Sequence, residues 1–257
     1  MNTLRFAWAL CSTALQESAS RRVAFLLQAS FMALNNVLFF STWWLLFARF
    51  DEIRGYRLPD MLALFGISAA GFGLGVALCG GALDLARAIA DGELDALLAQ
   101  PKSVLLRAVA SRSQASGWGD LVSGCVMLWL SGYDHYAAMA LAVLLSVVGF
   151  VASWAALSSA AFWVGRMDGV IRPLIDFVIT FTTYPPTLFG FRLKLVLFTL
   201  LPAGIIAYLP VELIRDPGLH TLLPAVGAVA AYALFASWLF GRGLRRYESG
   251  SRFGVMG

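Results

Sequence analysis

Long apolar stretches without charged residues alternate with short polar segments along this chain. A helix needs about 20 apolar residues to cross the hydrocarbon core of a bilayer, and five stretches come close to or exceed that length. Only one of them contains a charged side chain, that of Asp120. We therefore predict membrane-spanning helices in residues 23–48, 61–83, 113–133, 137–165 and 219–241.

The region 170–215 is less regular, because Arg192 and Lys194 divide it into two apolar pieces. The first piece is predicted to span the membrane from Pro173. The second, "LVLFTLLPAGIIAYLPVE" from Leu195, contains two prolines and a glycine that interrupt helical hydrogen bonding. Such a segment favours a re-entrant pair of half-helices packed against protein. Six spans with a re-entrant hairpin is the prediction, and seven spans is the alternative.

Composition and charge support a membrane protein of this topology. The chain is 60% hydrophobic and 13% charged, with a mean hydropathy of +0.76, which indicates an all-α integral membrane protein. With six spans, thirteen of the nineteen Lys and Arg residues fall on the side of both termini. Basic residues collect on the cytoplasmic side, so both termini are predicted inside. Anionic lipids explain the net charge of +4 without a nucleic-acid partner.

The first 22 residues lack the continuous apolar core and cleavage site of a signal peptide. Leu4, Trp8, Cys11 and Leu15 follow helical spacing on one side. This pattern is typical of a helix lying in the membrane interface. A flexible lead-in to the first span is the alternative.

Patterns for catalysis or metal binding are not found. The two histidines are far apart, the three cysteines are isolated, and no stretch has the spacing of a nucleotide-binding P-loop. The run "GFGLG" at 71–75 lies inside a predicted span, where glycines favour close helix packing. We therefore predict no catalytic residue, no metal site and no cofactor in this chain.

The run "DGELDALLAQP" at 91–101 follows the second predicted span on the cytoplasmic side. Gly92 interrupts the preceding helix and Pro101 ends the next one, so a short helix is predicted between them. Its leucines share one face, and its acidic residues occupy the first turn, where the helix dipole favours them. The segment is either a docking surface for another protein or a solvated turn. The candidate docking residues are Asp91, Gly92, Glu93, Leu94, Asp95, Leu97, Leu98, Gln100 and Pro101.

Polar side chains inside spans are costly and indicate protein interior or a transport pathway. The first span carries several amides, and the fifth ends in hydroxyl side chains before two prolines that break the helix. Helix packing alone is the alternative role for such residues. The pathway candidates are Gln28, Asn35, Asn36, Thr180, Thr183, Tyr184, Pro185 and Pro186.

Four runs occur in order along the chain: "AIADGELDALLAQP", "TYPPTLF" at 183–189, "LPAGIIAYLPVE" at 201–212 and the tail "RRYESGSR". Together they resemble the permease subunit of the ABC-2 family of bacterial ABC transporters, in its uncharacterised-export branch. The resemblance covers essentially the whole chain and implies one transmembrane domain over residues 1–257. In that domain, residues 1–22 would be an interfacial connecting helix, 84–103 a coupling region seated on an ATPase, and 193–218 an extracellular re-entrant segment.

The resemblance also implies partners and location. A dimer of permeases, identical or related, would bind two cytoplasmic ATPase subunits that hold ATP and Mg²⁺ on separate polypeptides. The chain itself would be no enzyme, and it would export its substrate across the bacterial inner membrane. An ATP-independent carrier or channel is the alternative that the residues leave open.

Overall fold

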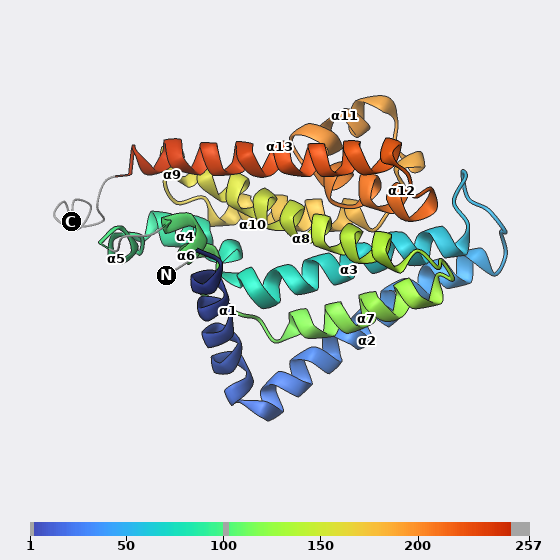
Figure 1. Cartoon of the computed structure of the whole chain (residues 1–257), viewed down its shortest axis with the longest axis horizontal. Coiled ribbons are helices and arrows are strands. Elements are labelled where there is room, and N and C mark those ends of the chain that lie inside the picture. Colours follow the sequence, from blue (N-terminus) through green and yellow to red (C-terminus); the bar gives the residue numbers. More distant parts are fainter. Residues whose placement is uncertain (1–2, 100–102, 248–257) are drawn as a thin grey trace.

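A computed structural model describes residues 3–99 and 103–247, and this part of the chain is nearly all helical. Within these residues no strand is assigned, and one isolated bridge joins Ile53 to Tyr56. The longer helices run mostly lengthwise through the molecule, with α2 oblique to the others (Figure 1). They are α2 (Arg22–Phe47), α3 (Leu58–Cys79), α7 (Ser116–Leu130), α8 (Tyr136–Ser159), α10 (Asp168–Thr182) and α13 (Leu219–Leu244).

Four helical segments are long and apolar enough to cross a membrane. They are Arg22–Phe47, Leu58–Ala90, Tyr136–Val164 and Leu219–Leu244, and they coincide with four of the five stretches expected to span. The remaining stretch, 113–133, forms α7, which has only 15 residues. Helix α10 has the same length. A bent pair of helices after α10 is either one broken span, which would make five candidate spans among the described residues, or a re-entrant loop. The chain is therefore a multi-pass membrane protein.

Helix α3 is the centre of the bundle, with 16 of its 22 residues buried. It packs closely against α7 because glycines face each other. A Cβ atom added at Gly73 or Gly117 would collide with the backbone of the opposite helix, and the same holds for Gly124. The glycines of the "GFGLG" run thus serve close helix packing, as expected.

A broken segment follows α10. It comprises α11 (Phe191–Thr199), the π-helix η3 (Gly204–Tyr208) and α12 (Leu209–Arg215), after the short turn η2 (Pro186–Leu188). The axis bends by 84° between α11 and the part from Gly204 onward. Pro202 lies in this break, where its missing N–H cannot continue the helical ladder. The hydroxyl of Tyr208 donates to the carbonyl of Phe181 over 2.6 Å and ties the segment to α10.

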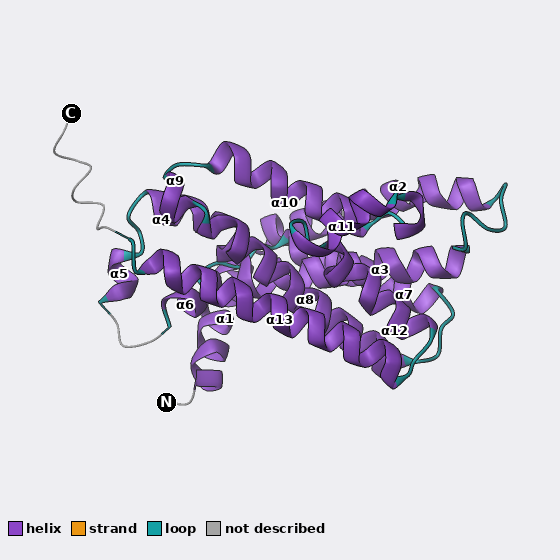
Figure 2. Ribbon diagram, turned by 90° about the horizontal axis from the view of Figure 1, so that it is seen from above, coloured by secondary structure: helices purple, strands orange, loops and turns teal. Residues whose placement is uncertain are grey.

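Short helices gather at the end of the bundle opposite the α2–α3 loop (Figures 1 and 2). Helix α1 (Thr3–Ser20) runs across this end before the chain turns into α2. The other short elements are η1 (Gly80–Asp84), α4 (Leu85–Ala90), α5 (Asp95–Leu98), α6 (Val104–Val109) and α9 (Ala161–Val164).

Candidate functional site

The segment expected to dock on a partner forms a tight turn followed by the single-turn helix α5. Gly92 has φ of +80°, a left-handed conformation that glycine adopts without steric cost. Asp91, just before it, forms an ion pair with Arg166 from the loop before α10. Arg112 approaches Glu93 at 3.9 Å. Side chains from two other parts of the chain thus hold this turn.

The three leucines of this segment do not share one accessible face, and the expectation that all three bind a partner is wrong for Leu94. Leu94 is fully buried in this chain's own core, and Leu97 is half-buried against the same cluster. Arg107 donates to the Leu97 carbonyl over 3.1 Å and fixes α5 against α6. The turn at Gly92 folds the leucine face inward, and Leu98, 46% exposed, is the leucine most open to a partner.

The end of α13 reaches the same segment through Tyr247. Burial and the neighbouring carboxylate of Asp95 raise the pKa of Tyr247 to about 12. The Tyr247 ring also packs edge-on against Phe162, with centroids 6.1 Å apart. Two further docking candidates, Gln100 and Pro101, lie outside the described residues.

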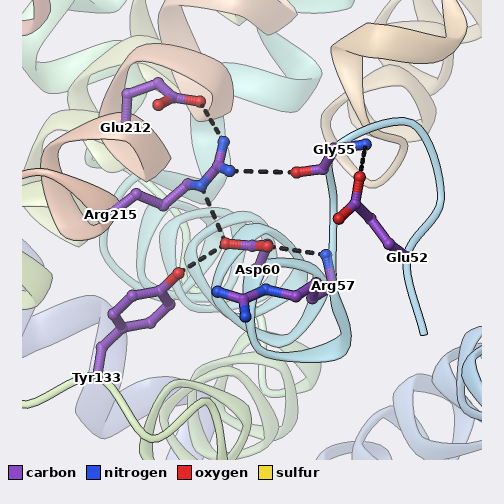
Figure 3. A network of polar contacts seen from close by, with 7 residues as sticks. All are labelled: Glu52, Gly55, Arg57, Asp60, Tyr133, Glu212 and Arg215. Carbon is purple, nitrogen blue, oxygen red and sulfur yellow. Dashed lines mark hydrogen bonds and ion pairs between the residues drawn. The ribbon is translucent and has the colours of Figure 1, made fainter.

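A buried polar network occupies the opposite end of the bundle (Figure 3). Its centre is Asp60, at the start of α3, whose side chain is only 4% exposed. The hydroxyl of Tyr133 donates to Asp60 Oδ1 over 2.6 Å, and the guanidinium of Arg215 lies 2.9 Å from the same oxygen. The backbone N–H of Arg57 donates to Asp60 Oδ2 over 2.8 Å. Two loops and the end of α12 therefore converge on one carboxylate.

Arg215 extends this network from the end of α12. It pairs with Glu212 at 2.9 Å, donates to the carbonyl of Gly55 over 3.2 Å, and stacks over the Tyr56 ring at 4.8 Å. Burial and the carboxylate of Asp60 raise the pKa of Tyr133 to about 12. The broken segment is thereby fastened to the α2–α3 loop. Sequence analysis missed these residues. Two signals were visible in the sequence: Asp60 is an acidic residue at the start of a span, and Arg215 is a basic residue at the end of the broken segment.

The pathway candidates of the first span occupy different environments. Asn36 is buried and donates to Asp120 Oδ1 over 2.7 Å and to Ser123 Oγ over 2.8 Å. It therefore joins α2 to α7, and helix packing is its role in the single chain. Asn35 points outward and is exposed, and Gln28 lines a cavity at the start of α2.

Helix α10 carries an exposed polar stripe that sequence analysis recognised only in part. Arg172, Asp176 and Thr180 are four residues apart and exposed, and Thr183 continues the row. Ile175 and Val178 on the other side of the helix are buried. The four-residue spacing of these side chains can be read from the sequence, whereas their exposure is seen only in the structure.

The remaining candidates pack at the end of α10. The ring of Tyr184 contacts Trp43 and Phe39 of α2, with centroids 5.6 Å and 6.4 Å apart. Pro185 is buried, and Pro186 begins η2, so the helix breaks here as predicted. Thr180 and Thr183 direct their hydroxyls to backbone carbonyls of their own helix. No group of three or more potential metal ligands occurs among residues 3–99 and 103–247.

Comparison with known families identifies the chain. Residues 33–251 match the family described as ABC-2 family transporter protein. No curated protein and no solved structure gives a match. The matched region covers most of the chain. It includes residues 91–98, called the coupling segment below after the role expected of them, as well as the Asp60 network and the broken segment. The resemblance noted in the sequence is therefore confirmed. This chain belongs to the ABC-2 family of transporter proteins.

Proposed function

We propose that this chain is the permease subunit of an ATP-binding cassette exporter in the bacterial inner membrane. Family membership supports a transport role, and the polar stripe on α10 carries the proposal. Polar side chains facing hydrocarbon are costly, so an exposed row of them indicates a protein contact or a water-filled path. The stripe lines the pathway in this proposal.

The proposed topology has six spans, with α7 and α10 as the two short ones. Fifteen residues cover about 22 Å at 1.5 Å per residue, less than a bilayer core of about 30 Å. Local thinning of the bilayer accommodates such helices. The excess of basic residues places both termini and the coupling segment in the cytoplasm. The broken segment is then re-entrant from the outside.

A second permease completes the pathway in this proposal. Only Asn36, Phe40 and Trp43 of α2 are buried, so most of that helix faces outward. Asn35 adds a polar amide to this outward face, where its contact within the chain is a weak hydrogen bond to Met32 Sδ at 4.0 Å and lipid adds no further partner. The contact of Tyr184 with α2 brings the end of α10 to the same side. We therefore place the dimer interface on α2 and α10.

Two separate ATPase subunits would bind ATP and Mg²⁺ and dock at the coupling segment. Leu98 and Glu93 are exposed there. Burying a leucine contributes about 1.5–3 kcal/mol, whereas a rim ion pair contributes roughly 0–1 kcal/mol. Leu98 therefore anchors the ATPase, and the inward-facing Leu94 and Leu97 pass its movement into the bundle.

Pull-down of the ATPase by the purified permease tests this docking. Leu98→Asp should abolish capture and transport-linked ATP hydrolysis. Val164→Asp is the matched control, because Val164 is an exposed aliphatic residue on α9 at the same end of the molecule. Full capture by Leu98→Asp, or equal loss in both variants, would refute the assigned surface.

Cysteine labelling tests the topology and the pathway. In a background lacking Cys11, Cys79 and Cys125, an impermeant reagent should label a cysteine at Asp134 but not one at Asp95 in intact cells. On α10, a water-soluble thiol reagent should reach a cysteine at position 176 in the assembled transporter but not one at position 178, where the side chain is buried on the other side of the helix. Labelling of position 95 from outside would contradict the six-span orientation.

A further inference from the structure

A polar cavity is lined by residues of α1, of the start of α2 and of the linker that precedes α7. Its volume is about 790 Å³, a size that accommodates small ligands or headgroups. Glu17, Arg21 and Arg112 supply its charged lining, and serine and glutamine side chains supply most of the rest. The cavity is separate from the sites described above, because no residue of the coupling segment, of the α10 stripe or of the Asp60 network lines it.

The charges around this cavity favour an anion. Arg21 is exposed and forms no ion pair among the described residues. Arg112 already pairs with Asp84 at 2.8 Å and lies 3.9 Å from Glu93, and Glu17 is the acidic side chain in the lining. The Oγ atom of Ser113 is buried without a hydrogen-bond partner within the part of the chain that the structure describes. The cavity thus offers one arginine, Arg21, without an ion-pair partner among the described residues, and a second, Arg112, that is already paired.

Two helices also begin at this cavity. Arg21 and Ala115, the N-cap residues of α2 and α7, both line it, and neither helix has a side-chain cap or an acidic residue in its first turn. The N-terminus of a helix carries a partial positive charge and free N–H groups that bind phosphate well. Both helix ends therefore add to the preference set by the arginines.

We propose that this cavity binds the phosphate group of an anionic membrane lipid. The exposed apolar side chains of Val23, Leu26 and Leu27 continue from the cavity along α2, and they provide a surface for acyl chains. This assignment rests on the proposed orientation, in which α1 lies at the cytoplasmic membrane interface. A free phosphate compound shares the same chemistry and is the other source of such a ligand.

Native mass spectrometry of the full chain released from nanodiscs measures this binding directly. With equal amounts of phosphatidylglycerol and phosphatidylcholine, the wild-type chain should retain phosphatidylglycerol preferentially. Arg21→Gln should reduce that retention roughly tenfold, the usual loss for one charge-assisted hydrogen bond. Glu17→Gln should increase it, because a repelling carboxylate is removed.

Arg166→Gln is the matched control, since Arg166 is an exposed arginine at the same end of the molecule outside the cavity. Equal retention of both lipids, or equal loss in Arg21→Gln and Arg166→Gln, would overturn the proposal. Displacement of phosphatidylglycerol by excess inorganic phosphate would reassign the site to a free phosphate compound. The measurement needs no ATPase, so it can fail while the transport function stands, and the reverse also holds.

Discussion

The two ends of the bundle hold their charged side chains in different ways. At the α2–α3 end, Asp60 is 4% exposed and has Tyr133, Arg215 and the Arg57 backbone as partners. At the coupling end, the side chains of Asp91 and Arg166 are 31% and 72% exposed. A buried charge depends on its partners because it has lost water, whereas an exposed one exchanges them for water at little cost.

The Asp60 network joins the broken segment to the α2–α3 loop through Arg215. The exposed pairs around α5 can rearrange when another surface approaches, because solvent already screens them. Four measurements test the contrast.

Arg215→Ala should have the largest effect, lowering the free energy of unfolding by about 3 kcal/mol, because it leaves the buried Asp60 carboxylate without its cation. Thermal unfolding in detergent, followed by circular dichroism, measures the loss. The double variant Asp60→Asn with Arg215→Ala should lose less than the sum of the two single variants. Strict additivity would show that the two groups do not stabilise each other.

Leu94→Ala should come next, at about 2 kcal/mol, because it opens a cavity in the core beneath the coupling segment. The same assay with Leu98→Ala, an exposed leucine in the same segment, should give a change within about 0.5 kcal/mol. Equal losses of stability in the two variants would mean that Leu94 is no more buried than Leu98.

Tyr133→Phe should lower the free energy of unfolding by about 1 kcal/mol, the value of one hydrogen bond. The fold raises the pKa of Tyr133 to about 12, above its unfolded value of roughly 10. Its contribution is therefore complete below pH 10 and is lost as the pH rises toward 12. Melting curves between these pH values should show a smaller alkaline loss in the variant. If the variant lost as much stability between pH 10 and 12 as the wild type, Tyr133 would not be the group that titrates in the network.

Arg166→Gln should have the smallest effect, within about 1 kcal/mol, because its ion pair with Asp91 is exposed. That small effect should fade at high salt, whereas the loss in Arg215→Ala should persist. Melting temperatures of both variants at low and high sodium chloride make the comparison. A large, salt-resistant loss in Arg166→Gln would erase the distinction between the two ends.

Several local features followed from the sequence because they depend on neighbours along the chain. The turn at Gly92, the helix break at the prolines after Tyr184 and the break at Pro202 were all predicted from backbone chemistry. The leucine face of the coupling segment was predicted too, since helical spacing determines which residues share a side. Spacing cannot say whether that side meets the chain's own core or a partner, and the Leu94 assignment was wrong for this reason.

The sequence by itself determined that this is a multi-pass helical membrane protein, because the length and hydropathy of a span are local properties. Its resemblance to the ABC-2 family rested on four sequence runs and was confirmed by the family match. Only the tertiary structure decided which polar groups meet. Asn36 reaches Asp120, and Asp60 reaches Arg215, although the residues of each pair lie far apart in the sequence. Such pairs depend on the rotation and depth of each helix in the bundle, which are set by side-chain packing between helices.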